Sequence, residues 1–254
     1  MTPLRVLSAN IQSGLSAGGV PTTGPELAAA FTGIQTDVVV LQEVDRYQNR
    51  SNRIDQVAVI AEALGLPHHR YAAALAGNVR GLRWMADPIG EYPGPAYGVA
   101  LASRFPITAW FATRLPQGVQ RLPTLKGLRP GWWVHEPRVG LAAVLQGPDG
   151  PFAVACTHLS LLPPVAWRQL QTLLTGVDGL ARRAIVAGDF NLPTRTVRKI
   201  APDWHLPEAL TFPAGTPLRQ IDHILVRGGT TANTASHRLA VSDHRVLATE
   251  VEWA

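Results

Sequence analysis

Short apolar runs that end in a carboxylate, an amide or an imidazole recur along this sequence. The most informative is Ile-Val-Ala-Gly-Asp-Phe-Asn-Leu-Pro at residues 185–193. Its β-branched start predicts a buried strand, and alternation of side chains places Asp189 and Asn191 on the same face of it. A carboxylate beside an amide suits a hard cation, a phosphate or an activated water. The alternative is that both residues form a turn or cap a helix.

Other predicted strands carry a similar residue at or near one end. These residues are Asn10 after the run 4–10, Glu43 after 38–43, His158 after 152–158 and Asp222 near the start of 221–226, and the turn Ser-Asp-His adds Asp243 and His244. Any one of them alone would more often be structural. Layered sheets bring strand ends to a common rim, where binding sites form, so the repeated pattern predicts one polar site built from distant parts of the chain.

The order of helical and extended segments predicts an α/β (α+β) protein. Helices are expected at 25–34, 55–64, 164–174 and 196–200, a strand at 70–76, hairpins at 97–113 and 138–158, irregular loops at 77–95 and 115–137, and a polar connection between 226 and 242. Strands that occur both as hairpins and between helices predict two packed mixed β-sheets flanked by helices. Since there is no internal repeat, low-complexity tract or linker, residues 1–254 are expected to form a single domain.

Charge and composition limit the classes of partner. The formal charge of +5 comes almost wholly from arginine, whose planar fork of donors favours phosphates. The arginines are dispersed, so the charge does not specify nucleic acid. No apolar run reaches the length of a membrane span, and the first ten residues lack the zones of a secretory signal. We therefore expect a cytoplasmic protein without a membrane span, and no obligate protein partner is evident.

The single cysteine, Cys156, excludes an internal disulfide framework and a cysteine-rich zinc site. It lies within an apolar, strand-like run, where a small buried thiol is the commoner role. We expect Cys156 to be structural rather than a catalytic nucleophile.

The polar residues at the strand ends form a chemically coherent set. Hard oxygen ligands of the kind that Mg²⁺ or Mn²⁺ accepts come from Glu43, Asn10 and Asp243. His158 and His244 could donate hydrogen bonds to phosphoryl oxygens or carry protons near neutrality. Asp222 is the candidate partner that would fix the tautomer of His244 and raise its basicity.

A series of sequence blocks resembles the signature of the endonuclease/exonuclease/phosphatase superfamily. In chain order they are Ser-Ala-Asn-Ile, Leu-Gln-Glu-Val-Asp, Gly-Val-Ala-Leu-Ala-Ser-Arg-Phe-Pro-Ile, Thr-His-Leu, Gly-Asp-Phe-Asn, Ile-Asp-His-Ile and Ser-Asp-His-Arg. The resemblance runs from Asn10 to His244, nearly the whole chain. It implies a four-layer αββα sandwich and magnesium-dependent cleavage of a phosphoester by a water nucleophile.

The same resemblance implies a role for each matching residue. Glu43 would be the main metal ligand, with Asn10 and Asp243 beside it. Asp189 would orient or deprotonate the attacking water, and Asn191 would hold that water or a phosphate oxygen.

The remaining roles concern the histidines and the substrate phosphate. Asp222 would pair with His244, and His158 would contact the phosphate or the leaving oxygen. Tyr97 and Arg138 resemble positions that touch the phosphate, although Arg138 could instead make a structural ion pair.

The branch of the superfamily is less constrained. Relatives that cut DNA tend to carry a basic residue two positions after the metal-binding glutamate, where this chain has Asp45. The blocks look more like the bacterial hydrolase and the sphingomyelinase- or phosphatase-like branches. We expect a phosphodiester rather than a monoester substrate, which leaves nucleic acid, a phospholipid head group and a small phosphorylated metabolite open. The competing hypotheses are a basic nuclease and a non-catalytic module that binds anions.

Several other polar and aromatic residues have a simpler interpretation. His223 should point to the opposite face from Asp222 and be structural. The other histidines are expected to lie in solvated loops; they are His68, His69, His135, His205 and His237. Two alternatives are open for the three tryptophans of the irregular segments: they form an apolar wall for a lipid or a base, or they are buried under a neighbouring loop. These residues are Trp84, Trp132 and Trp133.

Overall fold

Two β-sheets pack face to face in the computed structural model, which describes residues 3–78, 84–90, 92–118, 121–126, 129–134 and 136–254. The first sheet has the order β13 (Gly229–Arg238), β14 (Arg245–Trp253), β1 (Leu4–Asn10), β2 (Val38–Arg46), β5 (Ala96–Ser103), β3 (His68–Ala76) and β4 (Trp84–Met85). The second has the order β12 (Asp222–Arg227), β11 (Ala184–Asp189), β10 (Gly150–His158), β9 (Val139–Gly147) and β6 (Ile107–Arg114).

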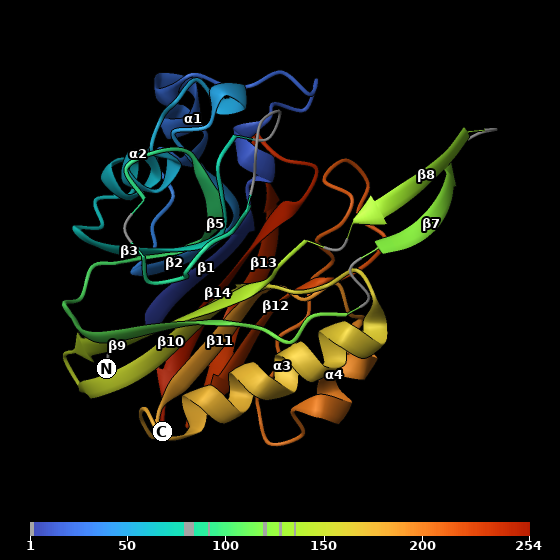
Figure 1. Cartoon of the computed structure of the whole chain (residues 1–254). Coiled ribbons are helices and arrows are strands. Elements are labelled where there is room, and N and C mark those ends of the chain that lie inside the picture. The colour runs from blue at the N-terminus through green and yellow to red at the C-terminus, as the bar shows by residue number, and fades with distance from the viewer. Residues whose placement is uncertain (1–2, 79–83, 91, 119–120, 127–128, 135) are drawn as a thin grey trace.

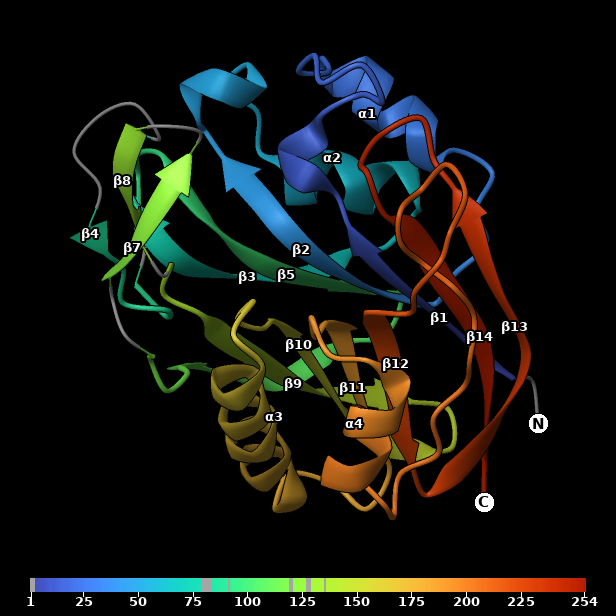
Figure 2. The same cartoon turned by 90° about the vertical axis from the view of Figure 1, so that its right-hand side faces the viewer.

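Helices cover the outer face of each sheet, which confirms the four-layer αββα sandwich. Figure 2 shows α1 (Gly24–Phe31) and α2 (Gln56–Ala63) on the first sheet, and α3 (Pro163–Asp178) and α4 (Thr194–Ile200) on the second. Figure 1 shows the same layers from another side, with the two chain ends near the same edge. The 3-10 turns η1 (Gln12–Gly14) and η2 (Asn49–Ser51) follow β1 and β2.

The helix starts follow from local chemistry. The Thr23 side chain accepts a hydrogen bond from the Glu26 amide, and the Glu26 carboxylate accepts one from the Thr23 amide, which is a capping box at the start of α1. Asp55 caps α2 through the Ala58 amide. Such caps typically contribute about 1 kcal/mol each.

The central strands are continuously apolar because both of their faces are buried. In β2, Val38 and Val40 belong to the core between the sheets, whereas Val39 and Leu41 pack on the α1 and α2 side. Full burial of such a side chain contributes about 1.5–3 kcal/mol. Polar residues are therefore concentrated in the second half of β2, which runs on through Gln42, Glu43 and Asp45 to Arg46 rather than ending at Glu43 as predicted.

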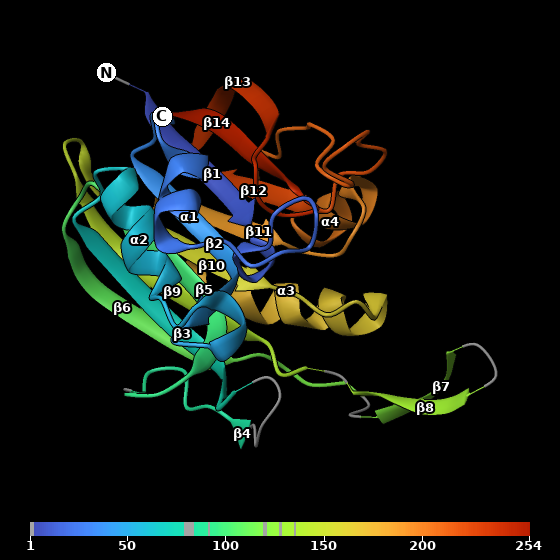
Figure 3. The same cartoon turned by 90° about the horizontal axis from the view of Figure 1, so that it is seen from above.

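The structure corrects several predicted boundaries. Residues 229–238 form the edge strand β13 rather than a polar connection, and this strand pairs with β14. An edge strand can be polar because part of it faces solvent, so its composition resembled that of a loop. The predicted irregular segment 115–137 contains the hairpin β7 (Arg121–Lys126) and β8 (Arg129–Val134), which extends away from the sandwich (Figure 3). β3 begins at His68, α1 ends at Phe31, α3 runs to Asp178 and the segment 77–95 contains β4.

None of the helices in the described ranges is long and apolar enough to cross a membrane.

Candidate active site

The predicted polar residues meet at one edge of the sandwich, around a cavity of about 650 Å³. Strand register explains this convergence, since His158 of β10 is the partner of Asp189 in β11, and Asp189 is the partner of Asp222 in β12. The first sheet brings the end of β1 and the middle of β2 to the same place. The predicted residues that line the cavity are Glu43, Tyr97, Arg138, His158, Asp189, Asn191, Asp243 and His244.

A local distortion of β2 presents Glu43 to the cavity. The register between β2 and β5 shifts between Leu41 and Val44, and Glu43 has a positive φ of 53°. A bulge of this kind re-aims a side chain, and a non-glycine residue in the left-handed region costs on the order of 1–3 kcal/mol. Burial raises the pKa of the Glu43 carboxyl, and this effect outweighs the lowering by Asn10 and Arg138.

Asn10 connects the two sheets at the site. Its Nδ2 donates to Glu43 Oε1 and to Asp189 Oδ2, each at 3.0 Å. Its Oδ1 accepts from the Gln12 amide at 3.0 Å. Two carboxylates from different sheets thus converge on one donor group.

Asp189 ends β11 in a buried position, with 2% of its surface exposed. The preceding Gly188 lets the strands approach, because a Cβ there would lie 1.9 Å from the Thr157 carbonyl oxygen. Asp189 Oδ1 accepts from the Asn191 amide at 3.0 Å. Burial and the neighbouring Asp222 raise the pKa of Asp189 to about 7, a value suited to accepting a proton near neutrality.

His244 forms a charge pair with Asp222. Its Nδ1 lies 2.9 Å from Asp222 Oδ2 and 3.2 Å from Oδ1, and Asp222 is fully buried. Although burial lowers the pKa of His244, the hydrogen bond and charge of Asp222 raise it to about 9. His244 is therefore an imidazolium at neutral pH, with Nε2–H 3.8 Å from Asp189 Oδ2.

His158 has the opposite protonation state. Burial and the charges of Arg138 and His244 hold its pKa well below the ordinary range. Arg138 Nη1 lies 3.1 Å from His158 Nδ1, and since a guanidinium only donates, Nδ1 accepts and the ring proton lies on Nε2. That Nε2–H is 3.5 Å from Asp189 Oδ2. Both imidazole Nε2 atoms therefore lie within 3.8 Å of one carboxylate oxygen, and both can donate to an anion held beside it.

Comparison with known proteins agrees with this arrangement. The sequence model of the endonuclease/exonuclease/phosphatase family matches residues 7–244. The chain belongs to this family. Members of the family are phosphoester hydrolases. No curated protein matches the sequence.

Solved structures share the fold at low sequence identity. An endonuclease/exonuclease/phosphatase from Beutenbergia cavernae is 23% identical with a TM-score of 0.73, and the match covers 100% of this chain and 72% of that one. The mannosyl-6-phosphatase of Bacteroides thetaiotaomicron is 17% identical with a TM-score of 0.63, covering 98% and 100%. Sphingomyelinase C from Streptomyces griseocarneus is 17% identical with a TM-score of 0.60, covering 99% and 100%.

The donor set of this family member fits a divalent cation. Glu43 and Asp189 come from different sheets and converge on the Asn10 side chain, so two carboxylates offer hard oxygen ligands at one point. A second grouping, Asp189 with Asp222 and His244, has possible ligand atoms within 4.8 Å of one another. In that grouping the imidazole is protonated and bonded to Asp222, so a metal would have to displace its proton.

The other predicted residues occupy distinct positions. Asp243 lies at the rim with 49% of its side chain exposed, 4.0 Å from His244 Nε2. Asn191 has a φ of 51° and its Nδ2 donates to the Leu159 carbonyl. Tyr97 is 6% exposed. Arg138 is 9% exposed, and its Nε has no hydrogen-bond partner among the described residues.

Sequence reasoning missed other residues of the cavity wall, including Arg50, Glu136, Phe212 and Arg219. Phe212 lies between the His244 ring, at 4.8 Å, and the Arg219 guanidinium, at 5.2 Å. These residues lie in turns or loops outside the strand blocks, so no periodic pattern marks them. For Arg50 one signal existed, since an acid at position 45 requires a cationic partner once that strand is buried.

The residues set aside as non-catalytic lie mostly away from the cavity. His223 is buried, with Nε2 2.8 Å from the Leu192 carbonyl oxygen. The prediction of solvated loops was wrong for His68, His69 and His237, which lie in β3 and β13, whereas His205 is exposed.

Of the three tryptophans predicted to form an apolar wall, Trp84 has a side chain within the described residues. Trp84 is 52% exposed in β4. His135 and the side chains of Trp132 and Trp133 lie outside what the structure describes.

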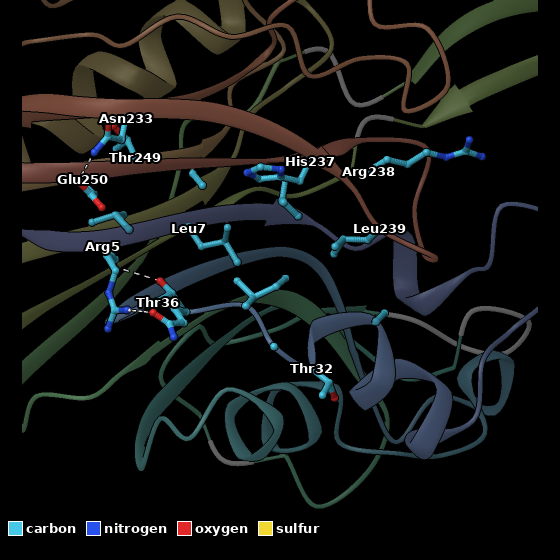
Figure 4. Close-up of a pocket in the computed structure, with 17 residues that line it drawn as sticks. Arg5, Leu7, Thr32, Thr36, Asn233, His237, Arg238, Leu239, Thr249 and Glu250 are labelled. Carbon is cyan, nitrogen blue, oxygen red and sulfur yellow. Dashed lines mark hydrogen bonds between the residues drawn. The ribbon is translucent and has the colours of Figure 1, made fainter.

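A separate groove of about 540 Å³ lies on the outer face of the first sheet, beside α1 (Figure 4). Two of its charged residues are engaged with protein partners: Arg5 pairs with Asp37, and Glu250 accepts from Asn233. This groove does not contain the converging carboxylates and imidazoles of the first cavity, so we assign the candidate active site to the cavity around Asp189.

Proposed function

We propose that this protein is a divalent-metal-dependent phosphoesterase that prefers phosphodiesters and uses water as the nucleophile. The observation that carries the proposal is the position of Asp189, a buried carboxylate with a pKa of about 7 and two imidazole N–H groups within 3.8 Å. A proton acceptor and donors to an anion therefore face the same point. Hydrolysis of a phosphate ester needs this combination.

Asp189 orients the attacking water and accepts its proton in this proposal. Because its Oδ1 is held by the Asn191 amide and its Oδ2 by Asn10, the carboxylate is fixed in one orientation before substrate binds. Asn191 also lines the cavity, where it holds the water or a phosphate oxygen.

Three cationic or N–H groups stabilise the charge that develops on the phosphate oxygens. His244 is kept protonated by Asp222, and His158 donates through Nε2, contacting the phosphate or the leaving oxygen. Arg138 contacts His158 and lines the cavity, which supports contact with phosphate, although it also forms a 4.0 Å ion pair with Glu136. Tyr97 is the further phosphate-side residue.

The proposed metal is Mg²⁺, with Mn²⁺ satisfying the same ligand preferences. Glu43 would hold it as the main ligand, with Asp243 and Asn10 beside it; Asn10 must present Oδ1 rather than Nδ2 to serve as a ligand. When bound, the ion would supply positive charge to polarise the phosphoryl oxygen.

The neighbours differ in substrate class, since one is described as a mannosyl-6-phosphatase and another as a sphingomyelinase C. Nucleic acid, a phospholipid head group and a small phosphorylated metabolite are all phosphoesters that the same chemistry can cleave. Asp45 in place of a basic residue argues against the nuclease.

A panel of phosphoesters tests the proposal. Bis-(p-nitrophenyl) phosphate, p-nitrophenyl phosphate, sphingomyelin, a lysophospholipid, plasmid DNA and RNA would be offered with Mg²⁺ and with a chelator, using the Asp189→Asn variant as the control. We expect turnover of at least one diester that requires Mg²⁺ and Asp189. Phosphate binding without metal-dependent turnover of any member would instead indicate a non-catalytic anion-binding module.

A further inference from the structure

A buried carboxylate lies two residues beyond Glu43 on β2. Asp45 is fully buried, and an unpaired ion there would cost several kcal/mol. Arg50 neutralises it in a fork: Nε donates to Asp45 Oδ2 and Nη2 to Oδ1, both at 2.7 Å. This contact occupies two of the five guanidinium N–H donors.

Arg50 is fixed on a second side by an aromatic ring. Its guanidinium carbon lies 5.3 Å from the centre of the Tyr97 ring, within the range of a cation–π contact. Tyr97 is the strand partner of Asp45 across β2 and β5. Two adjacent positions of the first sheet therefore hold one guanidinium from η2 in a defined orientation.

The held guanidinium lines the catalytic cavity. Its side chain is 36% exposed, and it shares the cavity with Glu43, Arg138 and Asp189. Arg138 is the arginine in contact with the His158 ring, whereas Arg50 contacts Asp45 and Tyr97 and also interacts with the charge of Glu136, a carboxylate of the same cavity wall. Arg50 therefore contributes to the cavity wall through its contacts with β2 and β5, whereas Arg138 contributes beside the imidazole of His158.

We propose that Arg50, oriented by Asp45 and Tyr97, binds an anionic group that the substrate carries apart from the phosphate that reacts. A planar guanidinium with its fork already set matches a phosphate or a carboxylate. This inference rests on the proposed function and deepens it, since it predicts a preference for phosphoesters with a second acidic group. Asp45 is then a positioning residue.

A purely structural charge pair is the competing explanation. Replacing a buried ion pair by neutral groups of similar shape is often neutral for stability, so a structural role alone does not require a cation at the cavity wall. If Arg50 binds an anionic group, the Arg50→Gln variant loses discrimination between ligands. If Arg50 only forms a structural charge pair, the variant loses stability alone.

Three-carbon ligands that differ in one group give a matched test. Binding of sn-glycerol 3-phosphate, 3-phosphoglycerate and 2,3-bisphosphoglycerate would be measured by calorimetry with Mg²⁺, in the Asp189→Asn background to prevent turnover. We expect 3-phosphoglycerate, 2,3-bisphosphoglycerate or both to bind about tenfold or more tightly than sn-glycerol 3-phosphate, as for a charged hydrogen bond. Tight binding of 3-phosphoglycerate would identify the carboxylate as the preferred group. Tight binding of 2,3-bisphosphoglycerate alone would identify the second phosphate.

Arg50→Gln should abolish this preference while leaving the affinity for glycerol phosphate within about twofold. Arg46→Gln is the matched control, because Arg46 ends β2 four residues before Arg50 and pairs with Asp55 at 3.0 Å without lining the cavity. An equal loss for all three ligands in Arg50→Gln, an unchanged preference, or no preference in the parent protein would each overturn the proposal.

A double variant separates binding from folding. Asp45→Asn combined with Arg50→Gln removes both charges, so melting should return toward that of the parent while the preference stays absent. A preference that returns with stability would show that Arg50 acts only on folding. Because binding is measured without turnover, the two failures are distinguishable: absence of hydrolysis on every phosphoester would refute the proposed function, whereas absence of the ligand preference in a protein that hydrolyses phosphoesters would refute only the role of Arg50.

Discussion

His244 Nδ1 lies 2.9 Å from Asp222 Oδ2, and this contact joins the start of β12 in one sheet to the turn before β14 in the other. The pair explains why one imidazole of the site is charged while His158 is neutral. Burial lowers the pKa of both rings, but only His244 has a carboxylate bonded to it. Two histidines in one cavity thus acquire different protonation states from their partners.

Replacing Asp222 by Asn should alter the pH dependence of turnover. Asp189 must be ionised and His244 protonated, so kcat/KM should rise as pH increases through about 7 and fall through about 9. Asp222→Asn removes the charge that raises the pKa of His244, so the alkaline limb should move to lower pH and the maximum rate should fall about 100-fold. A pH–rate profile checks this, and an unmoved alkaline limb would mean that another group sets it.

The same pair should affect stability with a definite sign. His244 has a folded-state pKa above its unfolded value, so its contribution is complete below about 6.5 and is lost as pH rises through about 9. The difference in unfolding free energy between the wild type and Asp222→Asn should therefore shrink between these values. Urea titrations at several pH values measure it, and a difference that grows with pH would contradict the assignment.

Asp189→Asn should separate catalysis from folding. Loss of the proton acceptor should lower kcat by about 10²–10⁴-fold, while removal of a buried charge should leave the melting temperature unchanged or higher. Steady-state kinetics and thermal melting of the two proteins provide the comparison. Full activity in the variant would show that Asp189 is not the base.

Glu43→Gln should weaken metal binding. A neutral amide is a poorer ligand than a carboxylate, so the dissociation constant for Mn²⁺, measured by electron paramagnetic resonance, should rise about tenfold or more. His244→Gln is the informative comparison. If the ion is instead held by Asp189, Asp222 and His244, this second variant will show the larger loss.

Cys156 should be inert in the folded protein. It is fully buried, and burial raises its thiol pKa to about 12, so little thiolate forms at neutral pH. Ellman's reagent should react only as the chain unfolds in urea, and Cys156→Ala should retain turnover. Rapid labelling of the native protein, or loss of activity with retained folding, would argue for a reactive thiol.

The sequence predicted the strands that carry the site because their chemistry is local. An apolar run buried on both faces ends where a polar residue becomes tolerable, and Asp189, Glu43 and His158 each mark such a point. Strand β13 was missed because an edge strand with a solvated face can be built from Thr, Ser and Asn. Its pairing with β14 is a tertiary contact that no local sequence pattern indicates.

The conformation of individual site residues could not be predicted from the sequence either, because it too depends on tertiary contacts. Asn10 was predicted to be an oxygen ligand, whereas its Nδ2 faces Glu43 and Asp189 in the structure. Arg50 was missed because its position depends on the turn η2 and on the ring of Tyr97. Both depend on contacts between segments far apart in the chain.

Asn10 and Glu43 come from one sheet and Asp189 from the other, and among the described strands no backbone ladder joins the two sheets. Their relative placement depends on the apolar side chains packed between the layers and on a few side-chain contacts across them, such as Asn10 with Asp189 and His244 with Asp222. A slide of less than an ångström between the layers would therefore misalign the reacting groups while every ladder stayed intact. Substitutions deep in the interlayer packing, remote from any substrate, can thus tune turnover.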